Sequence, residues 1–520
     1  MDGTDTTGAA ARGGAHRTLV AALLAVAIVM GALASAVGGD TDGHRARAAR
    51  HAPPPLPSTA PRAPRADVSL WVDASHRGRP VPSNFLGLSF EVSDLRQIAS
   101  YGERGDLVTL LRSLGPGLLR FGGVSADTRV AWADPQTPRP AWTSAVVEHL
   151  DLQALAGLAR ASGWHVILTV GLAHYEPQAA AREVAAAKRA LGPWLSAIEV
   201  GNEPDAYGRH AFRSEPWTFA RYAGEVRAYR RAIARLAPGI PFMGPGVSGS
   251  HAFKSWGPGE VREHPVVLTG HHYPLGCHQQ PQPSIPELLS PHVRVLEGRS
   301  LHRYLAVARR SGIPFRMDEA NSVSCGGRAG ISNTFASALW ATGYIAQSMA
   351  AGTSGINFEG NPANCFGYTA VCAPTVARLA DGGLNAQPLW YALLMTRGLV
   401  GDRPVASTLR ARHARNLAVT SFVERNGALQ LVICDDEPPG SAPASISVHV
   451  GRRFSAASVL ELSGPAQSAT AGVTLGGRTV GAGGYWSEPP NPPRIPVRGG
   501  SLALTLAPSS AQLVTVTPAG

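Results

Sequence analysis

The chain has 520 residues, of which 44% are hydrophobic, so it is long enough for a catalytic domain with a smaller companion, and its composition argues against wholesale disorder. Its net charge of +11 is spread along the sequence without Lys/Arg runs that interleave with aromatic residues, which argues against nucleic acid as a partner.

The N-terminal segment, residues 1–38, has the composition of a targeting sequence. Arg12 and Arg17 precede the uncharged run "TLVAALLAVAIVMGALASA", whose small residues at 34–36 are typical of a cleavage site. The run is also close to the length of a membrane span, so a cleaved signal peptide and an N-terminal membrane anchor both remain open. Residues 39–66 include "APPPLPSTAPRAPRA" and are predicted to form a Pro/Arg-rich linker. We therefore expect an extracytoplasmic protein, secreted or membrane-anchored.

Between residues 67 and 400, short β-rich runs alternate with longer amphipathic stretches of helical spacing. Near-continuous apolar strands that alternate with helices are typical of a parallel sheet covered on both faces. Eight such units predict an α/β fold, the (β/α)8 TIM barrel. The expected strands are "FLGLSFEV" (85–92), "GLLRFGG" (117–123), "HVILTVGL" (165–172), "LSAIEVGNEP" (195–204), "PFMGPGV" (241–247), "VVLTGHHYP" (266–274), "PFRMDEANS" (314–322) and "GINFEG" (355–360).

Polar and aromatic residues collect at the C-terminal ends of these runs. In barrel enzymes that end carries the active site, so we expect the functional residues there. The residues concerned are Glu91, Arg120, Asn202, Glu203, His271, His272, Tyr273, Glu319, Asn321 and Glu359.

Residues 401–520 change to strands separated by Gly, Pro and Ser turns, which predicts a C-terminal antiparallel β-sandwich. Two of its strands flank Asn426-Gly427, the signal of a type I′ hairpin turn. We expect the run "DVSLWVD" at 67–73 to join this domain.

Five cysteines are present, and an exported protein can form disulfides. Cys365 and Cys372 are seven residues apart and are predicted to form a local loop disulfide. The ends of the sixth and seventh strands, which are neighbours in the barrel, bring Cys277 and Cys325 together as a second pair. Cys434, inside an apolar strand, is expected to be a buried thiol. The spacing of "HHYPLGCH" fits no standard zinc pattern, and we expect neither a metal nor a cofactor.

Glu203 ends the fourth run and Glu319 ends the seventh, and these strands face one another across a barrel. Glycoside hydrolysis needs such a pair, one carboxylic acid to protonate the leaving oxygen and one carboxylate to attack the sugar or to activate water. Tyr273 with His271 or His272 could supply donors that keep the second carboxylate ionised. The alternative is a structural salt bridge at the barrel rim.

These motifs resemble those of a known group of enzymes. Asn202-Glu203-Pro204, the second glutamate and "LRFGG" resemble the clan A retaining glycosidases. Within that clan "FLGLSFEV", "LLRFGGVSAD", "GHHYPLG" and "MDEANSVSCGGRAGISNTFASALWATGYIAQSMAAGTSGINF" resemble glycoside hydrolase family 79, which contains β-glucuronidases and heparanases. The resemblance covers residues 85–400 and extends into the β-domain.

The resemblance implies roles for particular residues. Glu203 would be the general acid/base and Glu319 the nucleophile. Asn202 would bind the sugar 2-OH, Glu91 would meet ring hydroxyls, and Tyr273 would bond to the nucleophile. Glu359 is a weaker candidate for a hydroxyl contact. The uronate carboxylate would be bound by the Gly326 and Gly327 amides and the Tyr368 hydroxyl, since successive N–H groups form an anion nest; an ordinary turn is the alternative for the two glycines. Arg120, His271 and His272 would support the catalytic carboxylates, and a purely structural salt bridge remains open for Arg120.

The predicted function is that of a retaining exo-β-glucuronidase acting on glucuronide-containing carbohydrates. A heparanase-like endo-β-glucuronidase and a neutral-sugar clan A glycosidase are the alternatives among enzymes, and the lack of an obvious basic cluster favours exo action. A carbohydrate-binding pseudoenzyme would be expected to lack one carboxylate, and both are present. The oligomeric state stays open.

Overall fold

The computed structural model describes residues 66–490, 492 and 494–519, so the targeting segment and nearly all of the linker predicted for residues 1–66 lie outside the described residues. Within the described ranges, no helix combines the length and the apolar character that a membrane crossing requires.

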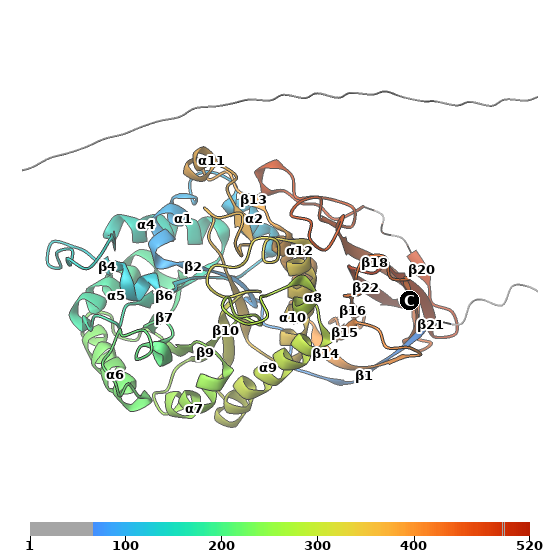
Figure 1. Ribbon diagram of the computed structural model, residues 1–520, viewed down its shortest axis with the longest axis horizontal. Helices are drawn as coiled ribbons and strands as arrows, with labels where there is room; N and C mark the ends of the chain where they lie inside the picture. Colours follow the sequence, from blue (N-terminus) through green and yellow to red (C-terminus); the bar gives the residue numbers. More distant parts are fainter. Residues whose placement is uncertain (1–65, 491, 493, 520) are drawn as a thin grey trace, which may run out of the picture. The chain divides into compact units, whose positions relative to one another are not determined.

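Eight parallel strands form the first sheet, in the order β7-β6-β3-β2-β11-β10-β9-β8. The strands at the two ends of this order meet through a bridge between Ile198 and Phe242, which nearly closes the sheet into the predicted barrel (Figure 1). Each expected run contains one of its strands: β2 (Leu86–Glu91), β3 (Leu118–Gly122), β6 (His165–Val170), β7 (Leu195–Val200), β8 (Met243–Val247), β9 (Val267–His272), β10 (Phe315–Ala320) and β11 (Gly355–Glu359).

Helices follow the barrel strands and lie outside them (Figure 1). Their ends carry the expected signals: α9 begins after the N-cap Ser290, whose side chain accepts the Val293 N–H, and ends at left-handed Gly312. The helices are α1 (Leu95–Ser100), α2 (Leu107–Leu114), α3 (Ser125–Thr128), α4 (His149–Ser162), α5 (Pro177–Leu191), α6 (Phe219–Leu236), α7 (Ser250–Val261), α8 (Ile285–Leu288), α9 (Pro291–Ser311), α10 (Phe335–Ala351), α11 (Val376–Asp381) and α12 (Pro388–Thr396).

The second sheet is mostly antiparallel and folds over its own core. Its order is β19-β18-β22-β16-β15-β14-β1-β17-β21, with β20 paired to β18. Because β14 pairs with β15 near its start and with β1 farther on, it links two layers, and apolar side chains of both layers share one core. The strands are β1 (Val68–Arg77), β14 (Arg403–Ala411), β15 (Leu417–Val423), β16 (Leu429–Asp435), β17 (Ala444–His449), β18 (Phe454–Ser463), β19 (Thr474–Leu475), β20 (Arg494–Pro496), β21 (Ser501–Leu506) and β22 (Ser510–Pro518).

Two details of this sheet differ from expectation. The strand β1 joins it but runs parallel to β17, so the sheet is not wholly antiparallel. The hairpin between β15 and β16 exists, but its turn is not of type I′, which needs positive φ at both central residues. Only Gly427 has positive φ, at 89°, and its N–H donates to the Glu424 carbonyl. This is the three-residue loop in which a type I turn precedes a left-handed glycine.

Both predicted disulfides are present, Cys277–Cys325 and Cys365–Cys372, and Cys434 is a buried free thiol in β16. The first disulfide joins the loops that follow β9 and β10. The second closes the loop after β11, where the short pair β12 (Val371–Cys372) and β13 (Asn385–Ala386) was not predicted. A further short pair, β4 (Val130–Trp132) with β5 (Ala145–Val147), lies between α3 and α4.

Candidate active site

A cavity of about 640 Å³ opens where the barrel strands end. Its wall comes from segments that are far apart in sequence, which the strand order of the barrel brings to one rim. The predicted site residues that line it are Glu91, Asn202, Glu203, Tyr273, Glu319, Gly326, Glu359 and Tyr368.

Glu203 occupies a strained turn between β7 and the short 3₁₀ helix η3 (Pro204–Ala206). Its backbone is left-handed, with φ 47°, and its N–H donates to the Gly246 carbonyl at 2.9 Å. Such a conformation in a non-glycine residue costs on the order of 1–3 kcal/mol and is a feature of functional sites. The side chain is 30% exposed, and Oε1 lies 2.9 Å from Nδ1 of His271.

Glu319, on β10, is held by donors on both of its oxygens. The Tyr273 hydroxyl donates to Oε1 at 2.8 Å, and Nη1 of Arg120 donates to Oε2 at 2.8 Å. Burial alone would raise the pKa of Glu319, but His271, Arg120 and Tyr273 outweigh it and lower that pKa. The side chain is therefore an ionised carboxylate at neutral pH, as a nucleophile requires.

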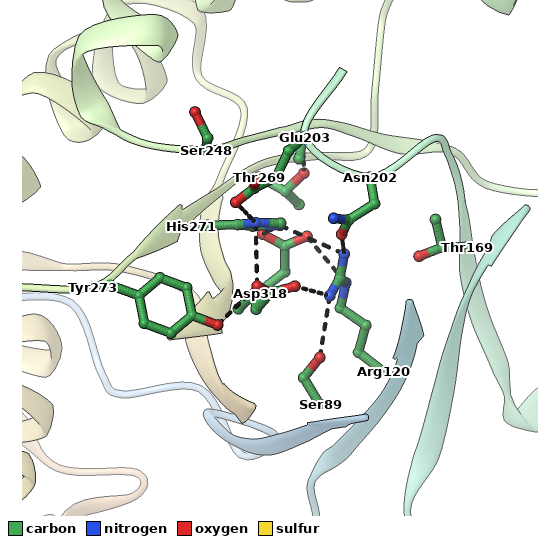
Figure 2. A network of polar contacts seen from close by, with 12 residues as sticks. Ser89, Arg120, Thr169, Asn202, Glu203, Ser248, Thr269, His271, Tyr273 and Asp318 are labelled. Carbon is green, nitrogen blue, oxygen red and sulfur yellow. Dashed lines mark hydrogen bonds and ion pairs between the residues drawn. The ribbon is translucent and has the colours of Figure 1, made fainter. Parts of the chain in front are cut away.

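His271 contacts both glutamates, and Figure 2 shows its ring beside Glu203. Its Nδ1 is 2.9 Å from Glu203 Oε1 and 3.6 Å from Glu319 Oε1. One oxygen of each glutamate and one ring nitrogen lie within 4.8 Å of one another. Although burial would lower the pKa of His271, the neighbouring carboxylates raise it to about 10, so the ring is charged at neutral pH.

Arg120 is fully buried on β3 and organises the floor of the site (Figure 2). Besides Glu319, its guanidinium donates to Glu199 Oε2 at 2.8 Å, Asn202 Oδ1 at 2.9 Å and Ser89 Oγ at 3.1 Å. Arg120 therefore forms buried salt bridges, one of which is to the candidate catalytic Glu319; its role in orienting that carboxylate stays a prediction.

Glu199 and Asp318, inside the barrel beneath the cavity, were missed by sequence reasoning. Burial alone would raise the pKa of Glu199, but Arg120 outweighs it and lowers it to about 2. Burial and the neighbouring Glu199 raise the pKa of Asp318, so this pair carries one negative charge and one proton. For Glu199 the signal was a charged residue inside an otherwise apolar strand, "AIEVG", whereas Asp318 directly precedes the predicted Glu319 in "FRMDEA".

Asp127, on α3, was also missed, although it lies in a quoted motif. It is fully buried, and its two oxygens accept four hydrogen bonds. The Leu172 and Ala173 N–H groups donate to Oδ1 at 2.7 and 3.0 Å, and the Asn202 N–H and Tyr207 hydroxyl donate to Oδ2 at 2.8 and 2.6 Å. Asp127 thus ties the loop after β6 to the turn that carries Asn202 and Glu203.

Other residues expected to meet the substrate line the cavity from the end of β2 and from the loops after β10 and β11. Glu91 accepts the Ser125 N–H on Oε2 at 2.8 Å, and burial raises its pKa. Tyr368 stacks on Tyr273 with ring centroids 5.7 Å apart, and its hydroxyl lies 3.4 Å from that of Tyr273. The Tyr368 N–H donates to the Gly326 carbonyl at 3.1 Å, which couples the two disulfide-bearing loops.

Two predicted residues do not serve the cavity as expected. His272 points to the outer face of the barrel, where it lies 3.5 Å from Glu297 and stacks on Tyr344, because successive residues of a strand face opposite sides. The Gly327 N–H donates to the Ser324 carbonyl at 3.3 Å, so it closes a turn rather than facing a ligand. Gly326, by contrast, lines the cavity, and no hydrogen bond from its N–H is found among the described residues.

Two groups of side chains place potential metal ligands close together. In the first, with His278, the sulfurs of Cys277 and Cys325 are joined to each other, so neither is a free thiolate. The second consists of Glu203, His271 and Glu319, and the charged His271 ring has no lone pair to offer near neutral pH. Neither group fits a metal in the state described.

No known family model matches the chain. A β-glucuronidase of Aspergillus niger (strain ATCC MYA-4892 / CBS 513.88 / FGSC A1513) is 29% identical over 180 residues, which are 31% of this chain and 33% of that protein. The chain thus spans about a third of the length of this curated relative.

Solved glycosidase structures resemble the chain over most of its length. A 4-O-α-L-rhamnosyl-β-D-glucuronidase of Fusarium oxysporum 12S has a TM-score of 0.68 and 19% identity, covering 86% of this chain and 100% of that one. A GH51 arabinofuranosidase of Xanthomonas axonopodis pv. citri has a TM-score of 0.63 and 14% identity, covering 87% and 100%. The chain therefore shares its fold with glycosidases that act on different sugars.

Proposed function

We propose that the protein is a retaining exo-β-glucuronidase similar to those of glycoside hydrolase family 79. The observation that carries the proposal is the pairing of Glu203 with Glu319 across His271, within 4.8 Å. Retaining glycosidases hold their two carboxyl groups about 5–5.5 Å apart, whereas inverting enzymes leave room for a water and need about 6.5–9.5 Å.

In the first step Glu319 attacks the anomeric carbon. A bond forms between one Glu319 oxygen and that carbon, the bond from the carbon to the glycosidic oxygen breaks, and Glu203 gives its proton to the departing oxygen. As charge leaves Glu319, Arg120 stays paired with Glu199, so its guanidinium keeps a buried anionic partner. Tyr273 and Arg120 fix the direction of attack through their two hydrogen bonds.

In the second step Glu203 accepts a proton from water, and the water oxygen replaces Glu319 at the anomeric carbon. The group that protonates and deprotonates must exchange protons with solvent between the steps. Glu203 suits this role, because its side chain is 30% exposed whereas that of Glu319 is 9% exposed.

The substrate class is proposed from hydrogen-bond donors that line the same cavity as the catalytic pair. A desolvated uronate carboxylate needs hydrogen-bond donors, or its burial costs several kcal/mol. The Gly326 N–H and the Tyr368 hydroxyl offer such donors without a cationic side chain. The β-glucuronidase of A. niger and the glucuronidase of F. oxysporum, which this chain resembles, support the same class. We also propose an extracytoplasmic location, which the two disulfides support.

The test compares 4-nitrophenyl β-D-glucuronide with the matching β-glucoside, β-galactoside and α-L-arabinofuranoside. We expect the glucuronide to have the highest kcat/KM by about 10²-fold, from two or three charge-assisted hydrogen bonds. Proton NMR of the first sugar released should show the β-anomer. Equal rates on glucoside and glucuronide, or initial release of the α-anomer, would refute the substrate class or the retaining mechanism respectively.

A further inference from the structure

Glu359, the last residue of β11, lines the cavity and has a buried carboxyl oxygen without a hydrogen-bond partner among the described residues. The residue is 4% exposed, and its Oε2 atom makes no hydrogen bond within the part of the chain that the structure describes. Buried polar atoms are nearly always paired, so an unpaired one at a cavity wall indicates a ligand atom that completes it. Neither catalytic step above uses this side chain.

The groups that face Glu359 come from every neighbouring element. The titratable ones are Glu91 at the end of β2, Arg120 on β3, Tyr273 after β9, Glu319 on β10 and Tyr368 after β11. The only cation among these five is Arg120, which already pairs with Glu199 and Glu319. Burial, Glu319 and Glu91 all raise the pKa of Glu359, so its carboxyl group keeps its proton and has an O–H to donate.

We propose that Glu359 is a specificity-determining residue whose un-ionised carboxyl group donates a hydrogen bond to the carboxylate of a bound uronic acid. This inference rests on the proposed function. It explains how an anionic sugar enters a cavity lined by four glutamates, because one of them presents a donor rather than a charge. The adjacent Tyr368 hydroxyl and the Gly326 N–H complete the set of donors, and a carboxyl–carboxylate hydrogen bond is of the short, strong kind.

The proposal has a consequence for pH that a structural role lacks. When Glu359 ionises, it loses its donor and repels the substrate carboxylate, so kcat/KM for glucuronides falls as pH rises through its pKa. A neutral glucoside has no such carboxylate, so its kcat/KM does not fall for this reason. The ratio of the two kcat/KM values at each pH cancels the ionisations that both reactions share, including those of Glu203 and Glu319. Glu91 lines the same cavity and also has a pKa raised by burial, so the Glu359→Gln variant is needed to separate the effect of Glu359 from that of Glu91.

The experiment measures kcat/KM for 4-nitrophenyl β-D-glucuronide and β-D-glucoside from pH 4 to pH 8, with the full chain. For the wild type, the glucuronide/glucoside ratio should fall by up to about tenfold per pH unit once Glu359 ionises. In Glu359→Gln the amide donates without ionising, so the ratio should stay constant over this range. In Glu359→Leu the donor is gone, and the ratio at acidic pH should drop by about 10–100-fold.

A matched control is Glu260→Gln. Glu260 is also buried, at 3% exposure, with an Oε2 atom that lacks a partner among the described residues, but it lies on α7 away from the cavity. The glucuronide/glucoside ratio of Glu260→Gln should equal that of the wild type at every pH. A wild-type ratio that rises between pH 4 and pH 8 overturns the proposal even if no variant folds, as does a Glu359→Leu ratio equal to that of the wild type at acidic pH. If these ratios contradict the role of Glu359 but the wild type still prefers the glucuronide, only this proposal is refuted. An enzyme that cleaves other glycosides and no glucuronide refutes the proposed function as well.

Discussion

The carboxylate of Asp127 accepts the backbone N–H of Asn202 at 2.8 Å, one residue before the strained Glu203. The same oxygen accepts the Tyr207 hydroxyl at 2.6 Å, so the turn is bound on both sides of the glutamate. Asp127 itself is buried and does not line the cavity. The position of the proposed acid/base is thus set by a side chain that is outside the reach of substrate.

Replacing Asp127 by Asn should lower kcat by the same factor for different sugars. The amide keeps one acceptor oxygen but turns its NH2 group toward two donors, which displaces the turn. A misplacement of about 1 Å costs about 10²-fold in rate. We expect kcat on the aryl glucuronide and on the aryl glucoside to fall by the same factor, with smaller changes in KM. Tyr207→Phe is the control, since it leaves the Asn202 bond in place and should have a milder effect.

The two proposed catalytic glutamates should respond differently to substitution. Glu319→Gln should abolish turnover of every substrate, because no other group can form the covalent intermediate. Glu203→Ala should still cleave substrates whose leaving group is an acidic phenol, which needs little protonation. Steady-state rates on aryl glycosides that differ in phenol pKa measure this difference.

Azide provides the complementary readout. A small anion can enter the space left by the Glu203 side chain and attack the intermediate, so azide should accelerate Glu203→Ala and yield a β-glycosyl azide. It should not accelerate Glu319→Gln. An equal loss on all leaving groups in both variants, with no azide product, would contradict the assigned roles.

The parts predicted well from sequence are those governed by local pattern. Apolar strands alternating with helices, and polar residues at one end of each strand, were enough to place Glu203 and Glu319 on one rim. The interior network was harder, because Glu199 looks like one polar residue in an apolar run, and Asp318 directly precedes Glu319, on which the interpretation of that strand rested. Both side chains pair with Arg120, which comes from a strand that is distant in sequence, so their role becomes visible only in the folded barrel.

The errors have physical causes too. For His271 and His272 the sequence did not decide which residue faced inward, since the two alternate across the strand and a shift of one residue exchanges their faces. Gly326 and Gly327 were treated as equivalent, but the backbone turn uses the N–H of the second. For Asn426-Gly427 the pair of residue types was right for a hairpin and left the loop length undetermined.

Burial of Glu183 in α5 should make stability depend on pH. Burial raises its pKa to about 8 from an ordinary 4.5. Below pH 4.5 the folded and unfolded states both hold the proton. Between these values the folded state keeps a proton that the unfolded state releases, so stability falls as pH rises, and above about 8 this contribution is constant.

Glu183→Gln removes this ionisation. We expect it to be more stable than the wild type by about 2–4 kcal/mol at pH 8, with the gain disappearing by pH 4.5. Denaturant unfolding at the two pH values measures it. The exposed Glu103→Gln serves as control and should show no such pH-dependent difference. A variant no more stable than the wild type at pH 8 would show that Glu183 is not held un-ionised.

Substitutions of the neighbouring Tyr273 and Tyr368 should distinguish effects on the chemical step from effects on sugar recognition. The Tyr273 hydroxyl donates to Glu319 at 2.8 Å, whereas that of Tyr368 lies 3.4 Å from the Tyr273 hydroxyl and makes no contact with Glu319 among the described hydrogen bonds. Tyr273→Phe removes a donor from the nucleophile, so kcat/KM should fall alike for aryl glucuronide and aryl glucoside. Tyr368→Phe leaves that bond intact and removes a proposed donor to the uronate, so kcat/KM should fall by about tenfold or more on the glucuronide and little on the glucoside. Both variants remove one hydroxyl oxygen from neighbouring rings, so each controls for the effect of the other on packing.

If Tyr368→Phe instead lowers kcat/KM equally for both substrates, this hydroxyl acts by orienting Tyr273, and the uronate carboxylate must be bound elsewhere.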